Sequence, residues 1–451
     1  MSNNSLDSVS EPSPSALALL PLGIFLVLFI GVGGYLTIQG VDFAFYQLPA
    51  PVAALPAVVV ALILSRDRLN RAIEQFLRGV GHTDIMAMCM IYLLAGAFAA
   101  VAKATGGVDA TVNLGLSLLP AVVILPGVFV ISAFISTAMG TSMGTIAAVA
   151  PVALGIAQTA GIDTPLMAGV VLSGAMFGDN LSIISDTTIA ATRSQGCHMR
   201  DKFRENLFIA LPAAVVAVAI FMLGNSVSEA PAAAAVEWVK VLPYITILVL
   251  AVSGLNVFVV LGIGIVLAGV IGMFSAAEYG LGNYVKDIYA GFGNMQEIFL
   301  LSMLIGGIGE LMRRQGGLAW LTGLVGRIIG AFSKDHTSGN SLKASELGIA
   351  GLVSLTNVCT ANNTVAIIVA GGVARKLAEE NGVTPRRSAS LLDIFSCVIQ
   401  GLLPYGAQAL LLGSIFAISP LSVVSHSYYC LLLAASGIIA VFLKHQKRNS
   451  R

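Results

Sequence analysis

The sequence predicts an all-α polytopic membrane protein built from two inverted repeats. Of its 451 residues, 57% are hydrophobic and only 10% are charged, whereas soluble domains usually carry about 25% charged residues. Apolar runs long enough to cross a bilayer recur along the chain, and a second series of them follows the layout of the first. We expect about ten transmembrane helices, two re-entrant hairpins and broken helices.

The apolar runs divide the chain into two halves. The first 16 residues contain no Lys or Arg, which argues against a signal peptide and keeps the first apolar run as an anchor. We expect a cytoplasmic tail at 1–16, a first repeat at 17–224, an extracytoplasmic linker at 225–240, a second repeat at 241–444 and a cytoplasmic tail at 445–451. The expected segments are 17–38, 50–65, 84–103, 119–160, 165–192 and 207–224, then 241–255, 256–275, 297–312, 317–332, 345–378, 388–418 and 426–444.

Similar residues at fixed spacing support the repeat. Three matches differ by 210 positions, namely Gly96 and Gly306, Lys103 and Arg313, and Gly106-Gly107 and Gly316-Gly317. Farther along, the spacing is 220, as in the pairs Ser136 and Thr356, Ser142 and Asn362, Pro165 and Pro385, and Asn180 and Gln400. Chance matching among Gly- and Ala-rich helices is the alternative, but the interruptions and linkers match as well as the letters. Five spans per half would invert the second half, as in many transporters.

The distribution of charge predicts the orientation. With Arg66 placed inside, all but three of the 24 Lys and Arg residues fall on the same side, the exceptions being Lys103, Lys240 and Lys286. Cytoplasmic loops carry this kind of excess. We therefore expect a multi-pass protein of the cell inner (cytoplasmic) membrane with both termini in the cytoplasm.

The most informative stretch runs from Ser173 to Arg204, because it combines apolar and polar residues. Its polar residues within ten positions are Asp179, Asn180, Ser182, Ser185, Asp186, Thr187 and Thr188. Carboxylates at membrane depth are costly and need water, a cation or a proton nearby. Short polar side chains compete for the backbone at 178–180 and 185–188, so we expect a broken helix there. A cytoplasmic loop from Gly178 is the alternative, but Ile183 and Ile184 keep the stretch apolar.

Two further interruptions carry small polar residues at what we expect to be hairpin tips. The first tip offers Thr141 and Ser142, and the second offers Asn362, Asn363 and Thr364. Helix ends at such breaks leave carbonyls or N–H groups free for ions. Each interrupted stretch could also be two full spans, and its small residues could serve helix packing.

Two other ionisable residues fall within spans. Asp393 lies deep in its segment and matches Ser173 at the 220 spacing, so we expect it in the site. Glu310 lies one helical turn before Arg313, which favours an intrahelical ion pair. A role as a proton relay is the alternative.

Several classes of function are excluded by missing motifs. There is no nucleotide-binding Walker A loop, no zinc-binding HExxH and no nucleophile elbow. The five cysteines are scattered without a CxxC pair. We expect no catalysis and no cofactor, and the net charge of +1 gives no sign of nucleic-acid binding.

The run from Phe177 to Asn206, FGDNLSIISDTTIAATRSQGCHMRDKFREN, resembles the signature of the NhaC family of sodium/proton antiporters. That family often shows a G-D-x-x-S-P-x-S-D-T-T pattern, and here Ile183 stands where proline is frequent. The resemblance implies a fold of two inverted halves, each with a re-entrant hairpin and a broken helix. Similar proteins include sodium/proton antiporters, a malate/lactate exchanger and proposed amino-acid carriers.

These observations favour a secondary transporter that exchanges cytoplasmic Na⁺ for external H⁺. Asp179, Asp186 and Ser185 are the expected Na⁺ ligands, with both carboxylates in a desolvated cavity where burial favours proton binding. The alternative is a sodium-coupled carrier of an amino acid or small carboxylate with the same Na⁺ site. The expected partners are lipid, Na⁺ and H⁺. A channel and a non-transporting regulatory protein are the rival classes, and a homo-oligomer is left open.

Overall fold

The computed structural model describes residues 13–41, 44, 47–118, 120–224, 235–275, 278–332 and 338–443. The regular secondary structure of these residues is helical, with no β-strand among them. The predicted C-terminal tail, most of the N-terminal tail and most of the linker lie outside the described residues.

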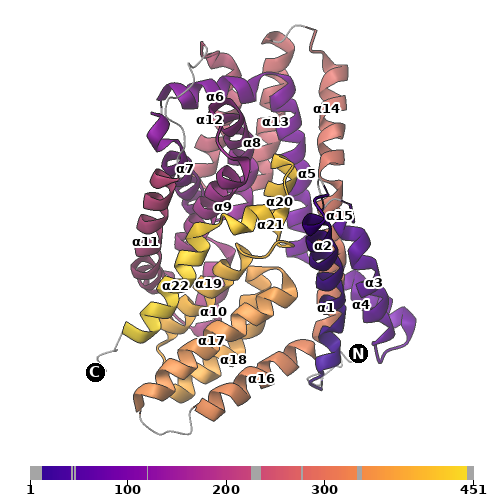
Figure 1. The fold of residues 1–451 in the computed structure, drawn as a ribbon, viewed down its shortest axis with the longest axis vertical. Coiled ribbons are helices and arrows are strands. Elements are labelled where there is room, and N and C mark those ends of the chain that lie inside the picture. The colour runs from indigo at the N-terminus through magenta and orange to yellow at the C-terminus, as the bar shows by residue number, and fades with distance from the viewer. Residues whose placement is uncertain are drawn as a thin grey trace, which may run out of the picture.

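Twenty-two α-helices make up the described fold (Figure 1). The first half contains α1 (Leu20–Leu26), α2 (Val32–Ile38), α3 (Ala50–Ile63), α4 (Leu69–Val80), α5 (Thr83–Ala104), α6 (Gly107–Leu118), α7 (Ile124–Met139), α8 (Ser142–Ala160), α9 (Thr164–Leu181), α10 (Asp186–Gln195) and α11 (Met199–Leu223). The second half contains α12 (Trp238–Val252), α13 (Val257–Ser275), α14 (Leu281–Asn294), α15 (Gln296–Arg314), α16 (Gly317–Phe332), α17 (Ser338–Thr360), α18 (Asn363–Asn381), α19 (Pro385–Gln400), α20 (Ala407–Phe416), α21 (Pro420–Ser425) and α22 (Tyr428–Leu443).

Long apolar helices confirm the class of membrane protein. Six described helical segments are long and apolar enough to cross a bilayer, or seven if α14 and α15, bent by 44°, count as one. Five other apolar helices have 10–17 residues. The expected number of about ten included such shorter helices.

The two halves pack reciprocally. Helix α4 packs on α15 while α14 packs on α5, and α10 packs on α18 while α20 packs on α8. In Figure 1 the helices α6 to α8 lie in the upper part of the molecule and α16 to α18 in the lower part. Tyr92 and Ser302, which differ by 210 positions, are buried and contact each other through their hydroxyl oxygens at 3.3 Å.

From α7 onward the structural spacing is 221, one more than the 220 expected from similar letters. Left-handed residues end equivalent helices at Gly140 and Ala361, and at Gly196 and Ala417. Pairing identical residue types gave 220 because it matched Pro165 with Pro385. In the structure Pro165 is the second residue of α9, whereas Pro385 is the first residue of α19. Thr141 is therefore equivalent to Asn362, and both cap the helix that follows with their side chains.

Both halves contain a broken helix. The first break is Ser182–Ser185, between α9 and α10, where Ser185 Oγ caps α10 by accepting from the Thr188 N–H. The expectation that helix also fails at 178–180 is wrong. Helix α9 continues to Leu181 and packs closely on α7, since a Cβ added to Gly178 would meet the Ala133 carbonyl. The second break, 401–406, lies inside the segment that we expected to run from 388 to 418.

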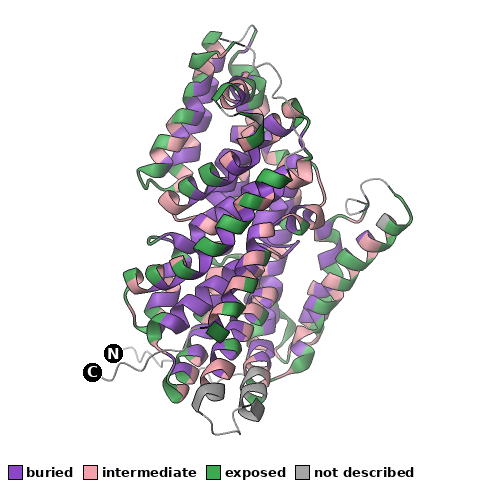
Figure 2. Cartoon of the chain, turned by 60° about the vertical axis from the view of Figure 1, so that its left-hand side comes forward, coloured by how far each residue is buried: buried purple, intermediate pink, exposed green. Residues whose placement is uncertain are grey.

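The broken helix of the first half is the most buried of the candidate membrane spans among the described residues. In the span that contains α9 and α10, 83% of the most apolar window is buried, against 33–67% in the other five spans. Figure 2 shows buried residues concentrated through the middle of the bundle and exposed residues on its outer helices. At the break itself Ser182 and Ser185 are buried, whereas Ile183 and Ile184 between them are exposed.

The equivalence of the two halves predicts a sidedness that can be measured. Thr159 and Glu380 are exposed, differ by 221 positions and lie near the ends of α8 and α18. Single cysteines at these positions, in a background without the native cysteines, should react with an impermeant maleimide from opposite sides of the membrane. Reaction of both from one side would contradict inverted repeats.

Candidate functional site

The carboxylate of Asp179 lies where the first hairpin tip meets α9. Asp179 is 5% exposed, and its Oδ2 accepts a hydrogen bond of 2.9 Å from Ser142 Oγ. Ser142 is the first residue of α8. The tip residue and the aspartate were both predicted as site residues, and the structure brings them together.

A chain of amide side chains continues from Ser142 into the second half. Gln408 Nε2 donates to Ser142 Oγ at 3.0 Å. Gln400 Nε2 donates to Gln408 Oε1 at 2.8 Å and to the Ala361 carbonyl at 3.2 Å. The chain therefore joins Asp179 to the second hairpin tip across the second helix break. Sequence reasoning missed Gln408, for which polarity within an apolar segment was the available signal.

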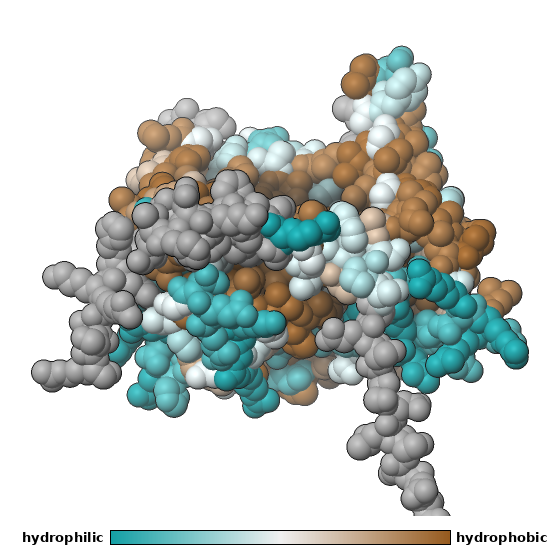
Figure 3. All heavy atoms as spheres, turned by 90° about the horizontal axis from the view of Figure 1, so that it is seen from below, coloured by the Kyte–Doolittle hydropathy of each residue, from teal (hydrophilic) through white to brown (hydrophobic). Residues whose placement is uncertain are grey.

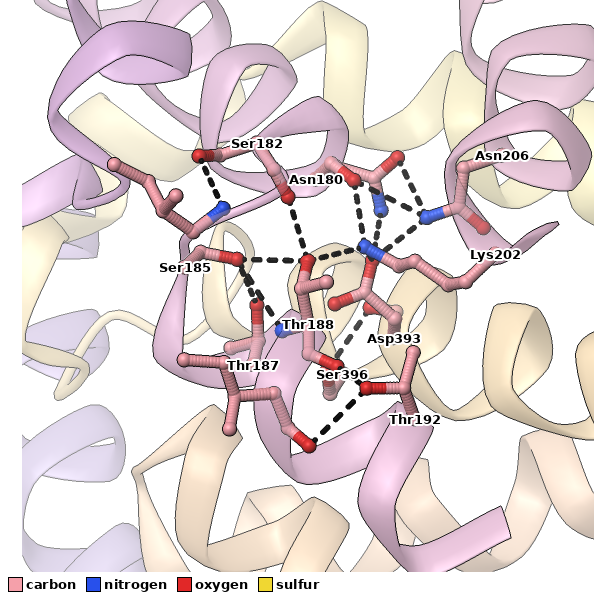
Figure 4. A network of polar contacts seen from close by, with 12 residues as sticks. Asn180, Ser182, Ser185, Thr187, Thr188, Thr192, Lys202, Asn206, Asp393 and Ser396 are labelled. Carbon is pink, nitrogen blue, oxygen red and sulfur yellow. Dashed lines mark hydrogen bonds and ion pairs between the residues drawn. The ribbon is translucent and has the colours of Figure 1, made fainter. Parts of the chain in front are cut away.

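A buried ion pair forms the second cluster (Figure 4). Lys202 Nζ lies 2.6 Å from Asp393 Oδ2, and neither side chain is exposed. Two amides also donate to this carboxylate oxygen, Asn206 Nδ2 at 2.7 Å and Asn180 Nδ2 at 3.0 Å. Asp393 and Asn180, predicted from opposite halves, thus meet in one cluster.

The same lysine binds the broken helix. Its Nζ donates to the Asn180 carbonyl at 2.9 Å and to Thr188 Oγ1 at 2.7 Å. Thr188 Oγ1 in turn donates to the Ser182 carbonyl at 2.7 Å. Ser182, Ser185 and Thr187, all 1–2% exposed, complete the polar lining of the break.

The charge count in the sequence analysis placed Lys202 among the cytoplasmic loop charges, but its side chain is buried. Positive-inside counting treats each Lys or Arg near a span as a loop charge, but α11 begins at Met199 and already packs inside the protein. Its buried residues Lys202, Glu205, Asn206 and Ile209 follow helical spacing and indicate one inward face. Arg387 is likewise buried, with its Nη2 2.8 Å from Glu346 Oε2.

Asp186 differs from the expectation. It is exposed at the first position of α10, where a helix N-terminus favours negative charge. It is therefore more open to solvent than Asp179, which is 5% exposed.

The second hairpin tip faces a separate cavity. Asn362 Oδ1 caps α18 through the Val365 N–H, and Asn363 Oδ1 accepts from the Thr364 N–H. Asn362 lines a cavity of about 260 Å³ together with His82 and Arg313. Glu310 pairs with Arg313 at 2.7 Å, which confirms the predicted ion pair.

A larger cavity lies at the other end of the same helices. Its volume is about 540 Å³, and its lining includes Gly96, Lys103 and Met295. Gly306, Arg313 and Ile85, the residues equivalent at a spacing of 210, line the smaller cavity. The C-terminal end of α5 lines the larger cavity, and its N-terminal end lines the smaller one. The two cavities therefore occupy opposite ends of the bundle. Broken helices with buried charges between two such chambers define a secondary transporter.

Comparison with known proteins points to a family of antiporters. The model of the Na⁺/H⁺ antiporter family matches residues 15–226. The Na⁺/H⁺ antiporter NhaC of Bacillus subtilis is 23% identical over 81% of this chain and 84% of its own. These matches support an NhaC-type Na⁺/H⁺ antiporter, in agreement with the resemblance seen in the Phe177–Asn206 run.

Two further relatives carry other names. The malate-2H⁺/Na⁺-lactate antiporter of Bacillus subtilis is 23% identical over 96% of both chains. The arginine/ornithine antiporter ArcD of Halobacterium salinarum is 21% identical over 89% of this chain and 88% of its own.

The buried ion pair predicts a large effect on stability. Asp393→Asn leaves the Lys202 ammonium buried without a carboxylate, a change that costs about 3–5 kcal/mol in other proteins. Thermal unfolding in detergent should therefore occur at a clearly lower temperature. The control is Glu379→Gln, which removes the exposed pair with Arg375 and should change stability by less than about 1 kcal/mol. Equal, small effects of both changes would contradict a structural ion pair.

Proposed function

We propose that this antiporter exchanges Na⁺ for H⁺ at the Asp179 carboxylate. The observation that carries the proposal is the unequal environment of two buried aspartates. Lys202 neutralises Asp393, whereas Asp179 accepts from a hydroxyl and forms no ion pair with any described residue. A buried carboxylate without a counter-charge is costly, so Asp179 favours a state with a bound proton or a bound cation.

Competition for one carboxylate couples the two ions. Protonated Asp179 is neutral and has no charge to hold Na⁺, while bound Na⁺ stabilises the ionised form. Ser142 Oγ is within hydrogen-bond distance of the carboxylate and is the first neutral ligand that we assign. Asn180, Ser182, Ser185, Thr187 and Thr188 place further oxygens at the neighbouring break, where the Asn180 carbonyl and the Thr188 hydroxyl contact Lys202.

Alternating access would use the two cavities at opposite ends of α5 and α15. We propose that the larger, with Lys103, faces the exterior and that the smaller, with Arg313, faces the cytoplasm of a cell whose inner membrane holds the protein. The positive-inside rule supports this orientation, since Arg66, Arg68 and Arg71 are exposed around the start of α4. Figure 3 views the corresponding lower face, where hydrophilic residues gather in several clusters around apolar surface.

A sodium-coupled carrier of an organic acid is the second candidate. Its support is the names of two relatives and the presence of Arg313 and Asn362 in the smaller cavity. Against it, Glu310 already neutralises Arg313, which weakens attraction for a carboxylate. Thermal stabilisation by malate or an amino acid only when Na⁺ is present would favour this candidate over simple exchange.

The two signature aspartates should differ in importance. In proteoliposomes, Asp179→Asn should abolish Na⁺-driven proton movement because it removes the shared ligand. Asp186→Asn should reduce it by less than about tenfold, the equivalent of about 1.4 kcal/mol, because Asp186 is exposed. Size-exclusion profiles must show that both variants are folded. Undiminished exchange by folded Asp179→Asn would overturn the proposal.

A further inference from the structure

Lys202 places an ammonium group among oxygens that resemble the ligands of a small cation. Its Nζ contacts a main-chain carbonyl at Asn180, a hydroxyl at Thr188 and a carboxylate at Asp393, over 2.6–2.9 Å (Figure 4). Hard oxygen ligands of these three kinds suit Na⁺. A carbonyl near the end of a broken helix is also the usual Na⁺ ligand of transporters built this way.

The carbonyl belongs to the last turn of α9. Because α9 ends at Leu181, its final carbonyls have no N–H partner within the helix. Asn180 O accepts from Asn206 Nδ2 at 3.1 Å in addition to the lysine. The carbonyl therefore keeps a polar partner when the ammonium is removed, and its lone pair toward Lys202 becomes free for another cation.

Two more oxygens lie in this cluster with unused capacity. Asp393 Oδ1 and Asn206 Oδ1 are buried and accept no hydrogen bond from the described residues. Both side chains are 0% exposed. Buried acceptors in native proteins are nearly always satisfied, so these atoms mark the cluster as rich in acceptors relative to donors. Such an excess favours a positively charged occupant.

We propose that Lys202 is a tethered cation that fills a second Na⁺ site at Asp393 and thereby restricts exchange to Asp179. The inference rests on the proposed function. An ammonium held by its own chain cannot leave, so Asp393 keeps the same counter-ion while Asp179 alternates between H⁺ and Na⁺. One exchanging carboxylate gives an electroneutral exchange of one Na⁺ for one H⁺. Lys202 is in this sense a specificity-determining residue.

The test is a gain of Na⁺ binding in a protein that has lost Asp179. Purified full-length Asp179→Asn should show no Na⁺-specific thermal stabilisation relative to choline at equal ionic strength. Adding Lys202→Met should restore it, with Tm raised by about 5 °C at a 100-fold excess over half-saturation. Lys376→Met in the same background is the matched control, because Lys376 is exposed, and it should restore nothing.

The remaining outcomes each decide the question. Adding Asp393→Asn to the Lys202→Met/Asp179→Asn protein should remove the Na⁺ response, because the second site loses its carboxylate. If Lys202→Met/Asp179→Asn folds only when purified in Na⁺ and not in choline, the inference is supported. If it folds and ignores Na⁺, or fails in both salts while the triple variant folds, the inference is wrong. A Na⁺ response in Asp179→Asn alone would instead count against the proposed function.

Discussion

The Lys202–Asp393 ion pair is the interaction on which the centre of this protein depends. It joins α11 of the first half to α19 of the second and also binds the break between α9 and α10. Two charges inside a membrane protein are tolerated only when they are paired and hydrogen-bonded. Lys202 neutralises Asp393. The two buried carboxylates therefore differ, and Asp179 is the one that we assign to exchange.

The hydrogen bonds of Asp179 give the second constraint. Through Ser142, Gln408 and Gln400 they reach the carbonyl of Ala361 at the second hairpin tip. This series of hydrogen bonds connects the two halves, and it links both hairpin tips through the two ends of the second helix break. Binding or loss of a proton or cation at Asp179 therefore alters its hydrogen bond with Ser142 at the first tip. Such a contact is a physical means of linking ion binding to movement of the hairpins.

Much of the fold and part of the site could be predicted from the sequence. Apolar runs and small polar interruptions are local signals, and they placed the break near Ser185, the tip at Ser142 and the deep carboxylate Asp393. Tertiary facts were missed. The burial of Lys202 depends on which face of α11 packs inward, and the exposure of Asp186 depends on the start of α10. The spacing of 221 is visible in the left-handed backbone conformation of Gly140 and Ala361, which are different residue types.

The central claim, that Na⁺ and H⁺ compete for Asp179, is tested most directly by counting protons. Na⁺ is added to purified protein in weak buffer with a pH indicator, over a series of starting pH values. The account predicts release of about one proton per Na⁺ at low pH, falling toward zero at high pH, and no release from Asp179→Asn. Na⁺ binding without proton release at any pH, or undiminished release from Asp179→Asn, would contradict it.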